Sequence, residues 1–251
     1  MTTNAIDRIK QMITSDSRWS SERGDFVIYV DDTGFDKIAD REIGSIICAG
    51  DAILIDQWRQ WFMSPQLNTA AMPRTERAVG SGLESITVSY VQRGTGRVHT
   101  YNGWYLDFGD HAKFSGSGAV FAHDCFTRNR CAITCIGSAV QRDPFSGGNT
   151  MFVDAATGRN NLSRAFRTLA DVHTELDNRG EVMNMKNGKR MPFKVWAADP
   201  ASGDRALSAK DITLSAPTGQ PSRAWTQEER DEFKSVLDQD LARHMSEACS
   251  D

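Results

Sequence analysis

The start of the chain carries a hydroxyl group that could act as a nucleophile. Position 2 is a threonine, and an initiator methionine is normally removed when the residue after it is small. Cleavage of the Met1–Thr2 bond leaves Thr2 with a free α-amine beside its hydroxyl. Such an amine has an ordinary pKa of about 7.7–8.0, so it can accept the hydroxyl proton near neutral pH. A nucleophile and its base would then share one residue.

Two later residues could place charge beside this nucleophile. The segment TSDSR predicts the end of a short hairpin that starts at the N-terminus and returns Asp16 towards Thr2. Lys37 follows in the segment DKI, at the end of the next strand region. The alternatives are an ordinary surface pair of Asp16 with Arg18, and a solvated loop lysine at position 37.

Small and polar residues further along could supply hydrogen bonds to a reacting group. Gly50, in CAGDA, lies at a predicted strand-to-helix turn, where a backbone N–H can point at a developing oxyanion. The segments GSG and RDPFSGG contribute Ser117, Asp143 and Ser146. The simpler interpretation is that Ser117 serves a tight turn at a helix start and that Asp143 and Ser146 belong to a common loop.

In this order, these segments resemble the N-terminal-threonine (Ntn) hydrolases of the proteasome β-subunit and HslV type, over about residues 1–155. The resemblance implies that Thr2 is the nucleophile and that its own amine is the general base. It also implies that Lys37 lowers the proton affinity of this centre and that Asp16 pairs with and positions the lysine. Gly50 matches the oxyanion donor. The residues that match the group hydrogen-bonding around the threonine and its amine are Ser117, Asp143 and Ser146.

The order of predicted elements indicates the α+β class, because strands, helices and strands succeed one another without regular alternation. We expect strands at 26–30, 44–50 and 150–155, a hairpin at 85–106, and helices at 51–63, 118–126 and 130–142. With the resemblance, this implies an αββα four-layer Ntn-hydrolase sandwich, in which two antiparallel sheets lie between helices. Asn4 and Asp7 are expected to interrupt its first strand.

The chain divides into a core at 1–156 and an additional C-terminal α/β region at 157–251. In that region we expect a helix at 161–176, a polar turn region at 180–190, edge strands at 193–200 and 211–217, and a final helix. Thr226 and Glu229 predict a capping box for the final helix. Its apolar face comprises Phe233, Val236, Leu237, Leu241 and Met245. Whether this region is a separate domain or wraps the core stays open.

Charge and hydropathy exclude several classes of protein. Thirty-three acidic against 29 basic residues leave a net charge of −4, which does not supply the basic surface that non-specific nucleic-acid binding needs. We expect no membrane partner, because no stretch approaches the roughly 18 apolar residues of a membrane span. The N-terminus lacks the apolar core of a signal peptide, and the five cysteines fit free thiols, so we expect a cytoplasmic protein.

Other groups of residues are weaker candidates for a metal or nucleotide site. A set of one histidine and three cysteines could suggest zinc, but it lacks the usual paired CxxC spacing; its members are His123, Cys125, Cys131 and Cys135. Cys131 and Cys135 are four apart on a predicted helix, which favours buried core positions. The two GSG segments, at 80–82 and 116–118, are not followed by the Lys-Ser/Thr pair that a phosphate-binding loop requires. We therefore expect no metal and no organic cofactor.

The sequence thus predicts a threonine protease or related hydrolase that cleaves peptide or amide bonds through an acyl-threonine intermediate after Met1 removal. The expected partner is a peptide or protein substrate. The resemblance adds a homo-oligomer and an ATPase unfoldase, while the shortened helical region leaves ring assembly open. Two alternatives remain: a catalytically inactive proteasome-like binding or inhibitory module, for which a phage origin is one option, and a small-molecule amidase of the same fold.

Overall fold

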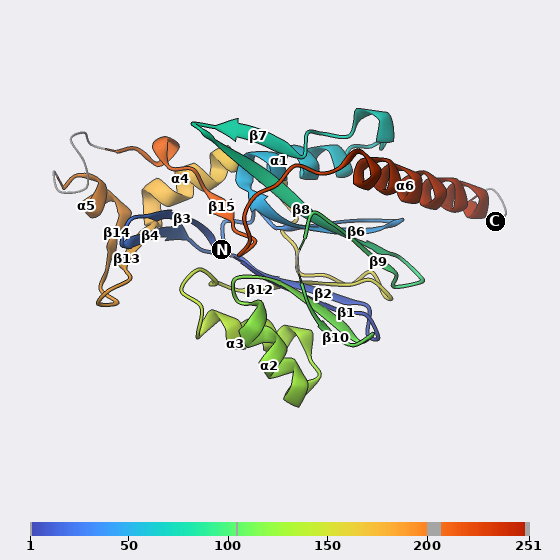
Figure 1. The fold of residues 1–251 in the computed structure, drawn as a ribbon, viewed down its shortest axis with the longest axis horizontal. Coiled ribbons are helices and arrows are strands. Elements are labelled where there is room, and N and C mark those ends of the chain that lie inside the picture. The colour runs from blue at the N-terminus through green and yellow to red at the C-terminus, as the bar shows by residue number, and fades with distance from the viewer. Residues whose placement is uncertain (1, 104, 200–206, 249–251) are drawn as a thin grey trace.

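The chain forms two antiparallel β-sheets with helices on their outer faces (Figure 1). The computed structural model describes residues 2–103, 105–199 and 207–248. Six α-helices occur in these ranges, which confirms the mixed α+β class. None of the helices in the same ranges is long and apolar enough to span a membrane.

The first sheet has the start of the chain at its centre. Its strands, in spatial order, are β10 (Leu106–Phe108), β11 (Ala112–Gly116), β1 (Thr3–Asp7), β2 (Met12–Asp16) and β12 (Thr150–Asp154). β1 and β2 form the predicted N-terminal hairpin, with Ile6 opposite Ile13. Asn4 and Asp7 do not interrupt β1, contrary to expectation. The Asn4 side-chain oxygen accepts a hydrogen bond from Ser15 Oγ (2.7 Å), so this buried polar group is satisfied within the sheet.

The second sheet is larger and is built from both halves of the chain. Its strands, in spatial order, are β14 (Arg190–Pro192), β13 (Glu181–Asn184), β4 (Phe26–Val30), β3 (Trp19–Arg23), β15 (Ser215–Ala216), β6 (Gly44–Asp51), β8 (Gly82–Gln92) and β7 (Glu76–Val79). Two further strands lie off this path: β5 (Ile38–Arg41) pairs with β6, and β9 (Val98–Tyr101) pairs with β8. Three late strands thus complete a sheet that begins near residue 19.

The sheets face each other, and helices cover their outer sides (Figure 1). α2 (Ala119–Asn129) and α3 (Ala132–Val140) cover the first sheet, while α1 (Ala52–Phe62), α4 (Leu169–Arg179) and α6 (Gln227–Ala248) lie over the second. Because neighbouring strand residues point to opposite faces, Ala5 packs with α2 and α3, whereas Ile6 packs with Ile47 between the sheets. Cys48, the next residue on β6, points to the opposite, helix-covered core.

Most elements expected before residue 156 are confirmed. The strands at 26–30, 44–50 and 150–155 correspond to β4, β6 and β12. The hairpin at 85–106 corresponds to β8 and β9, but its second strand ends at Tyr101; Leu106 belongs to β10 of the first sheet, and residue 104 lies outside the described ranges. The helices at 51–63, 118–126 and 130–142 correspond to α1, α2 and α3. α1 begins where expected because the Asp51 side chain caps it, accepting hydrogen bonds from Ile53 N and Leu54 N.

The C-terminal region differs from the expectation in four places. The helix expected at 161–176 begins only at Leu169, because Thr168 and Asp171 form a capping box there. The segment 180–190 is not a polar turn region alone: β13 pairs with β4 and turns back into β14. Long-range pairing with β4 buries Val182 in the core, and such pairing leaves no local signal.

The two expected edge strands are also corrected. The segment 193–200 contains the helix α5 (Phe193–Ala197), which buries Phe193 and Trp196 at helical spacing; residue 200 lies outside the described ranges. The segment 211–217 contributes only β15, and β15 lies inside the sheet between β3 and β6 rather than at an edge. Two 3₁₀ turns, η1 (Thr69–Ala71) and η3 (Ala209–Asp211), complete the elements.

The final helix is confirmed together with its capping box. Glu229 N donates to Thr226 Oγ1 (3.1 Å), and Thr226 N donates to Glu229 Oε2 (2.8 Å). Phe233 and Leu237 are buried in the core, and Val236 and Leu241 pack against it. Met245 does not share this apolar contact, because it is 68% exposed. The helix therefore packs along its first half more than along its last turns.

Residues after 157 share one core with the earlier part of the chain. The Trp225 ring packs against Trp58 at a tilt of 40° with 5.4 Å between ring centroids, and Phe233 contacts the Trp58 ring at 5.3 Å. Val172 and Leu176 of α4 belong to the same buried cluster. The late elements therefore stabilise the second sheet directly.

Candidate active site

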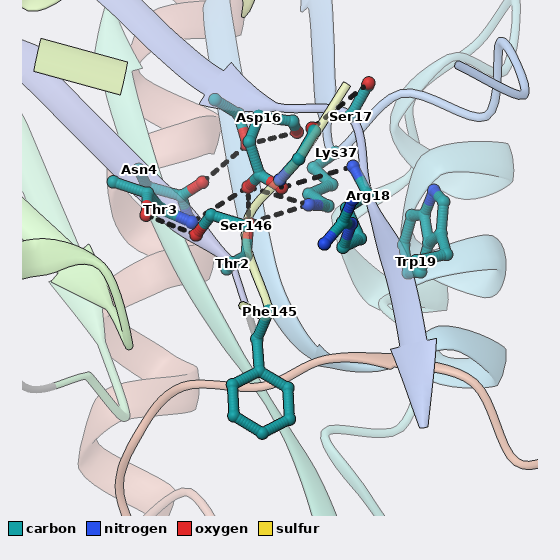
Figure 2. Close-up of polar contacts among 12 residues, drawn as sticks. Thr2, Thr3, Asn4, Asp16, Ser17, Arg18, Trp19, Lys37, Phe145 and Ser146 are labelled. Carbon is teal, nitrogen blue, oxygen red and sulfur yellow. Dashed lines mark hydrogen bonds and ion pairs between the residues drawn. The ribbon is translucent and has the colours of Figure 1, made fainter. Parts of the chain in front are cut away.

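Three of the sequence-predicted site residues are brought together by the N-terminal hairpin and the segment before β5 (Figure 2). Thr2 precedes β1, and the antiparallel register of β1 with β2 returns Asp16 beside it. Lys37 precedes β5, and its carbonyl oxygen accepts a hydrogen bond from Cys48 N (2.9 Å). That bond fastens the lysine backbone to β6.

The Thr2, Asp16 and Lys37 side chains form one hydrogen-bonded cluster, which we call the Thr2 cluster. Lys37 Nζ lies 2.8 Å from Thr2 Oγ1 and 2.9 Å from Asp16 Oδ1. Thr2 Oγ1 donates to the same Asp16 oxygen at 2.5 Å. The Lys37 side chain is only 1% exposed, so the alternative of a solvated loop lysine is wrong.

Backbone groups hold the Asp16 carboxylate in place. Asp16 Oδ1 also accepts from Thr3 N (2.8 Å), and Oδ2 accepts from Arg18 N (3.2 Å) and Gly147 N (3.1 Å). A buried carboxylate is tolerated only when its oxygens are hydrogen-bonded, and these donors meet that need. Asp16 is therefore oriented by three separate segments of the chain.

The position of Lys37 affects both its own proton and that of Thr2. Burial lowers the pKa of Lys37 below its ordinary value, while the Asp16 carboxylate opposes that shift. In its charged form, the ammonium group donates to the Thr2 hydroxyl, which favours loss of the hydroxyl proton. The Trp19 ring lies 5.6 Å from Lys37 Nζ and shields the ammonium group on another side.

Ser117, Asp143 and Ser146 also meet, in a second hydrogen-bond network. Ser117 Oγ and Ser146 Oγ both donate to Asp143 Oδ2, the latter at 2.6 Å. Ser146 Oγ lies a further 2.6 Å from Thr3 Oγ1. The resemblance placed these residues around the first threonine. The structure instead connects this network, through the Ser146 hydroxyl alone, to the next residue, Thr3, which follows Thr2 into β1.

Gly50 lies at the end of β6, just before the residue that caps α1, as expected for a strand-to-helix turn. It is paired in register with Ile86 of β8 and Ala216 of β15, and it joins neither hydrogen-bond network in the described part of the chain. Its φ of +117° and the Ser85 carbonyl, 2.2 Å from where a Cβ would stand, both require glycine here.

The glycines of the GSG segment at 116–118 allow the chain to pass close to the two threonines. A Cβ on Gly116 would lie 1.9 Å from the Thr2 carbonyl oxygen, and one on Gly118 would lie 1.8 Å from Thr3 Oγ1. This segment is therefore glycine-rich because of close packing. Ser117 between them can reach Asp143 for the same reason.

Sequence reasoning missed Thr3 and the role of Arg18. Arg18 is not in a surface pair with Asp16: its guanidinium is buried, pairs with Asp31 (2.8 Å) and lies 3.7 Å from the centre of the Tyr29 ring. A Cβ on Gly147 would stand 2.3 Å from this guanidinium, so the glycine makes room for it. The repeated threonine and the Ser-Gly-Gly segment were the available signals.

The cysteine set lies in and beside the core under α2 and α3. Cys125 and Cys135 are buried, and burial raises the pKa of Cys135 above its ordinary value. Cys131 is partly exposed just before α3, so the core interpretation holds for Cys135 and not for Cys131. The described residues contain no group of three or more His, Cys, Asp or Glu side chains placed to hold a metal ion.

The Thr2 cluster brings a hydroxyl, an ammonium group and a carboxylate within hydrogen-bond distance of one another. Nucleophilic catalysis by threonine also needs a base, and cleavage of the Met1–Thr2 bond would create one on the same residue. No protein-family model matches the chain, and no curated protein matches it in sequence.

Proposed function

We propose that this protein is an Ntn hydrolase that cleaves peptide or related amide bonds with Thr2, after removal of Met1. The observation that carries the proposal is the 2.8 Å contact of Lys37 Nζ with Thr2 Oγ1 inside a buried cluster that Asp16 holds together. The two facing antiparallel sheets with outer helices support assignment to the αββα sandwich of that family.

In the first half of the proposed reaction, Thr2 Oγ1 attacks the carbonyl carbon of the substrate. Its proton passes to the α-amine of Thr2, and the carbonyl π electrons move to oxygen. The Lys37 ammonium stabilises the developing alkoxide on Thr2. Gly50 is the proposed oxyanion donor, as the family resemblance implies; it lies two residues beyond Cys48, whose N–H is bonded to the Lys37 carbonyl, and it is paired with Ala216 of β15 in this structure.

In the second half, the carbon–nitrogen bond breaks and the protonated α-amine gives its proton to the leaving nitrogen. This leaves an ester between the acyl group and Thr2. A water molecule then attacks the ester carbonyl and transfers a proton to the α-amine, which passes it to Thr2 Oγ1 as the acid departs. Every step uses groups of the chain and water.

Ser117, Asp143 and Ser146 act as positioning residues in this scheme. Their network ends on Thr3 Oγ1, and Thr3 N is bonded to Asp16. The residue after the nucleophile is thus held on its side chain and on its backbone. Holding Thr3 restricts the orientation of Thr2 relative to Lys37, which reduces the freedom that must be lost before attack.

Partners follow from the proposed reaction and the family resemblance. A peptide or protein is the proposed substrate, and a homo-oligomer served by an ATPase unfoldase is the proposed setting. Digestion of an unfolded protein, compared with hydrolysis of small amides, separates a peptidase from a small-molecule amidase. Light scattering of the purified protein tests the oligomer.

One observation favours a second candidate, a binding or inhibitory module without catalysis. In the chain that still carries Met1, Thr2 is fully buried, with 0% of its surface exposed, and so is Asp16. A nucleophile must be reached by its substrate, whereas a structural ion pair need not be. In this second candidate the Thr2 cluster only connects β1, β2 and the segment before β5.

The test is an intact-mass measurement with and without a peptide epoxyketone, a reagent that captures a free amine and its neighbouring hydroxyl together. We expect loss of Met1 and a single adduct, absent from Thr2→Ala. Thr14→Ala is the matched control, because the Thr14 hydroxyl is also buried in the first sheet but donates to the Ala5 carbonyl (3.1 Å). Met1 removal without an adduct would favour the binding module.

A further inference from the structure

The strand β15 separates two strands that are not paired with each other. In the second sheet β3 and β6 both pair with β15, which is two residues long. Figure 1 shows where β15 lies in the fold. Ser215 lies opposite Ser20 on one side, and Ala216 lies opposite Gly50 on the other. The short strand therefore spans the width of the gap between β3 and β6 at Ser20 and Gly50.

That gap has the dimensions of one extended chain. Neighbouring strands lie about 4.8 Å apart, so β3 and β6 stand about two such spacings from each other across β15. Without β15, each would present unpaired N–H and C=O groups to the gap. A slot of this kind takes an extended peptide by strand addition.

The chain enters the gap as a strand would and leaves it at a proline. Leu214 and Ala216 are buried at alternate positions, and the Leu214 carbonyl accepts from Ala52 N (3.2 Å). Pro217 then ends the pairing, since it has no N–H. Trp225 fixes the far end, where its Nε1 donates to the Ile86 carbonyl (2.7 Å). We call residues 215–222, between these two anchors, the strap.

Beyond β15 the strap crosses the segment that packs on the nucleophile. The Cβ position of Gly219 lies 3.6 Å from Gly116 C and from Ser117 Cα. Gly116 in turn is packed against the Thr2 carbonyl. A pocket of about 390 Å³, open to the surface, lies between the strap and Gly50, Glu84 and Ser85. The strap is thus held at both ends but incompletely packed in between.

We infer that the strap is an internal occupant of the site, which holds the slot between β3 and β6 closed and keeps an extended peptide from Thr2. The inference rests on the proposed hydrolase function and adds a form of control to it. The strap has to leave the slot before a substrate chain can pair beside Gly50.

A reversible disulfide can test this in one molecule. Ser20 and Ser215 are antiparallel partners, and such partners have Cα atoms about 4.5–5.5 Å apart, within the range that a disulfide spans. In Ser20→Cys/Ser215→Cys, oxidation locks the strap and a reductant releases it. The matched control is Ser89→Cys/Thr100→Cys, which joins β8 to β9 at two hydroxyls that lie 3.0 Å apart.

The readout is the rate of peptide epoxyketone labelling, with Met1 removal checked by intact mass. In the strap pair, we expect oxidation to slow labelling at least tenfold and a reductant to restore the original rate. In the control pair, neither treatment should change the labelling rate. Equal labelling rates of the oxidised and reduced strap pair would overturn the inference about the strap, while the proposed hydrolase function would still stand.

A variant that expels the strap distinguishes failure of the inference about the strap from failure of the hydrolase proposal. Ala216 has no exposed surface, so Ala216→Arg has no room for its side chain and should expel the strap, while Thr218→Arg lies on a partly exposed position and serves as the control. We expect a lower melting temperature for Ala216→Arg, because β15 no longer pairs with β3 and β6, and faster labelling at a temperature where the variant is still folded. If neither this variant nor the reduced strap pair labels, although the Thr2 amine is free, the hydrolase proposal itself fails.

Discussion

Lys37 and Asp16 form an ion pair of 2.9 Å in the protein interior, and the Thr2 hydroxyl bonds to both partners. Neither charged side chain has more than 1% of its surface exposed. Burying two charges costs several kcal/mol per ion, and apolar residues of similar volume often stabilise a core as well or better. Stability alone is therefore a poor reason for this pair, whereas activation of the hydroxyl between them uses both charges.

The coupling of this pair can be measured by a double-mutant cycle. Lys37→Met leaves the Asp16 carboxylate buried without its cation, so we expect a loss of about 3–5 kcal/mol in the free energy of unfolding. Adding Asp16→Asn should cost much less than its effect in the wild-type background, because the unpaired charge is then gone. Denaturant unfolding of all four proteins gives the coupling energy. Simple additivity would show that the two groups do not act as a pair.

The two threonine hydroxyls should differ in their effect on labelling. Thr2→Val removes the proposed nucleophile, so no epoxyketone adduct is expected. Thr3→Val removes only the contact with Ser146 and should cost about 1 kcal/mol of stability, slow labelling about tenfold and leave one adduct. Labelling rates from intact mass check both variants. An adduct that is lost in Thr3→Val but retained in Thr2→Val would show that Thr3, and not Thr2, is the nucleophile.

The close approach of Gly118 to Thr3 makes that glycine sensitive to substitution. A methyl group there would meet Thr3 Oγ1 at 1.8 Å and Ser146 Oγ at 3.1 Å, so Gly118→Ala should destabilise the protein by about 1–3 kcal/mol and slow labelling. Gly137→Ala on α3 meets nothing within 4 Å and should add about 0.5–1 kcal/mol. Thermal unfolding of both variants tests the contrast, and equal shifts would contradict it.

Glu229 should make stability depend on acid pH. Its hydrogen bond with Arg223, against the opposing effect of burial and with help from Thr226 and Asn102, lowers the pKa of the Glu229 carboxyl from 4.5 to about 2. Because the folded pKa is depressed, its contribution is complete above pH 4.5 and is lost as the pH falls towards 2.

The variant Glu229→Gln tests this contribution. It should lower stability by about 1 kcal/mol at neutral pH, through weakening of the capping box and of the Arg223 pair. The difference between the variant and the wild type should then shrink as the pH falls through that window. Unfolding free energies measured across the acid range check the sign. A difference that stays constant with pH would contradict the pKa assignment.

Local patterns in the sequence were sufficient for much of the fold around the site. The hairpin that returns Asp16 to Thr2 and the helix after Gly50 depend on neighbours in the chain: a short turn, and the Asp51 cap. The capping box of α6 is local in the same way. These features are predictable because their hydrogen bonds close over a few residues.

Tertiary structure alone decided how the late segments are used. β13 becomes a strand because it meets β4, which is more than 150 residues earlier, and β15 fills a gap between β3 and β6. The link from Ser146 to Thr3 spans 143 positions. No short window of sequence encodes such partners, because a strand or a buried hydroxyl is satisfied by whatever the rest of the chain brings beside it.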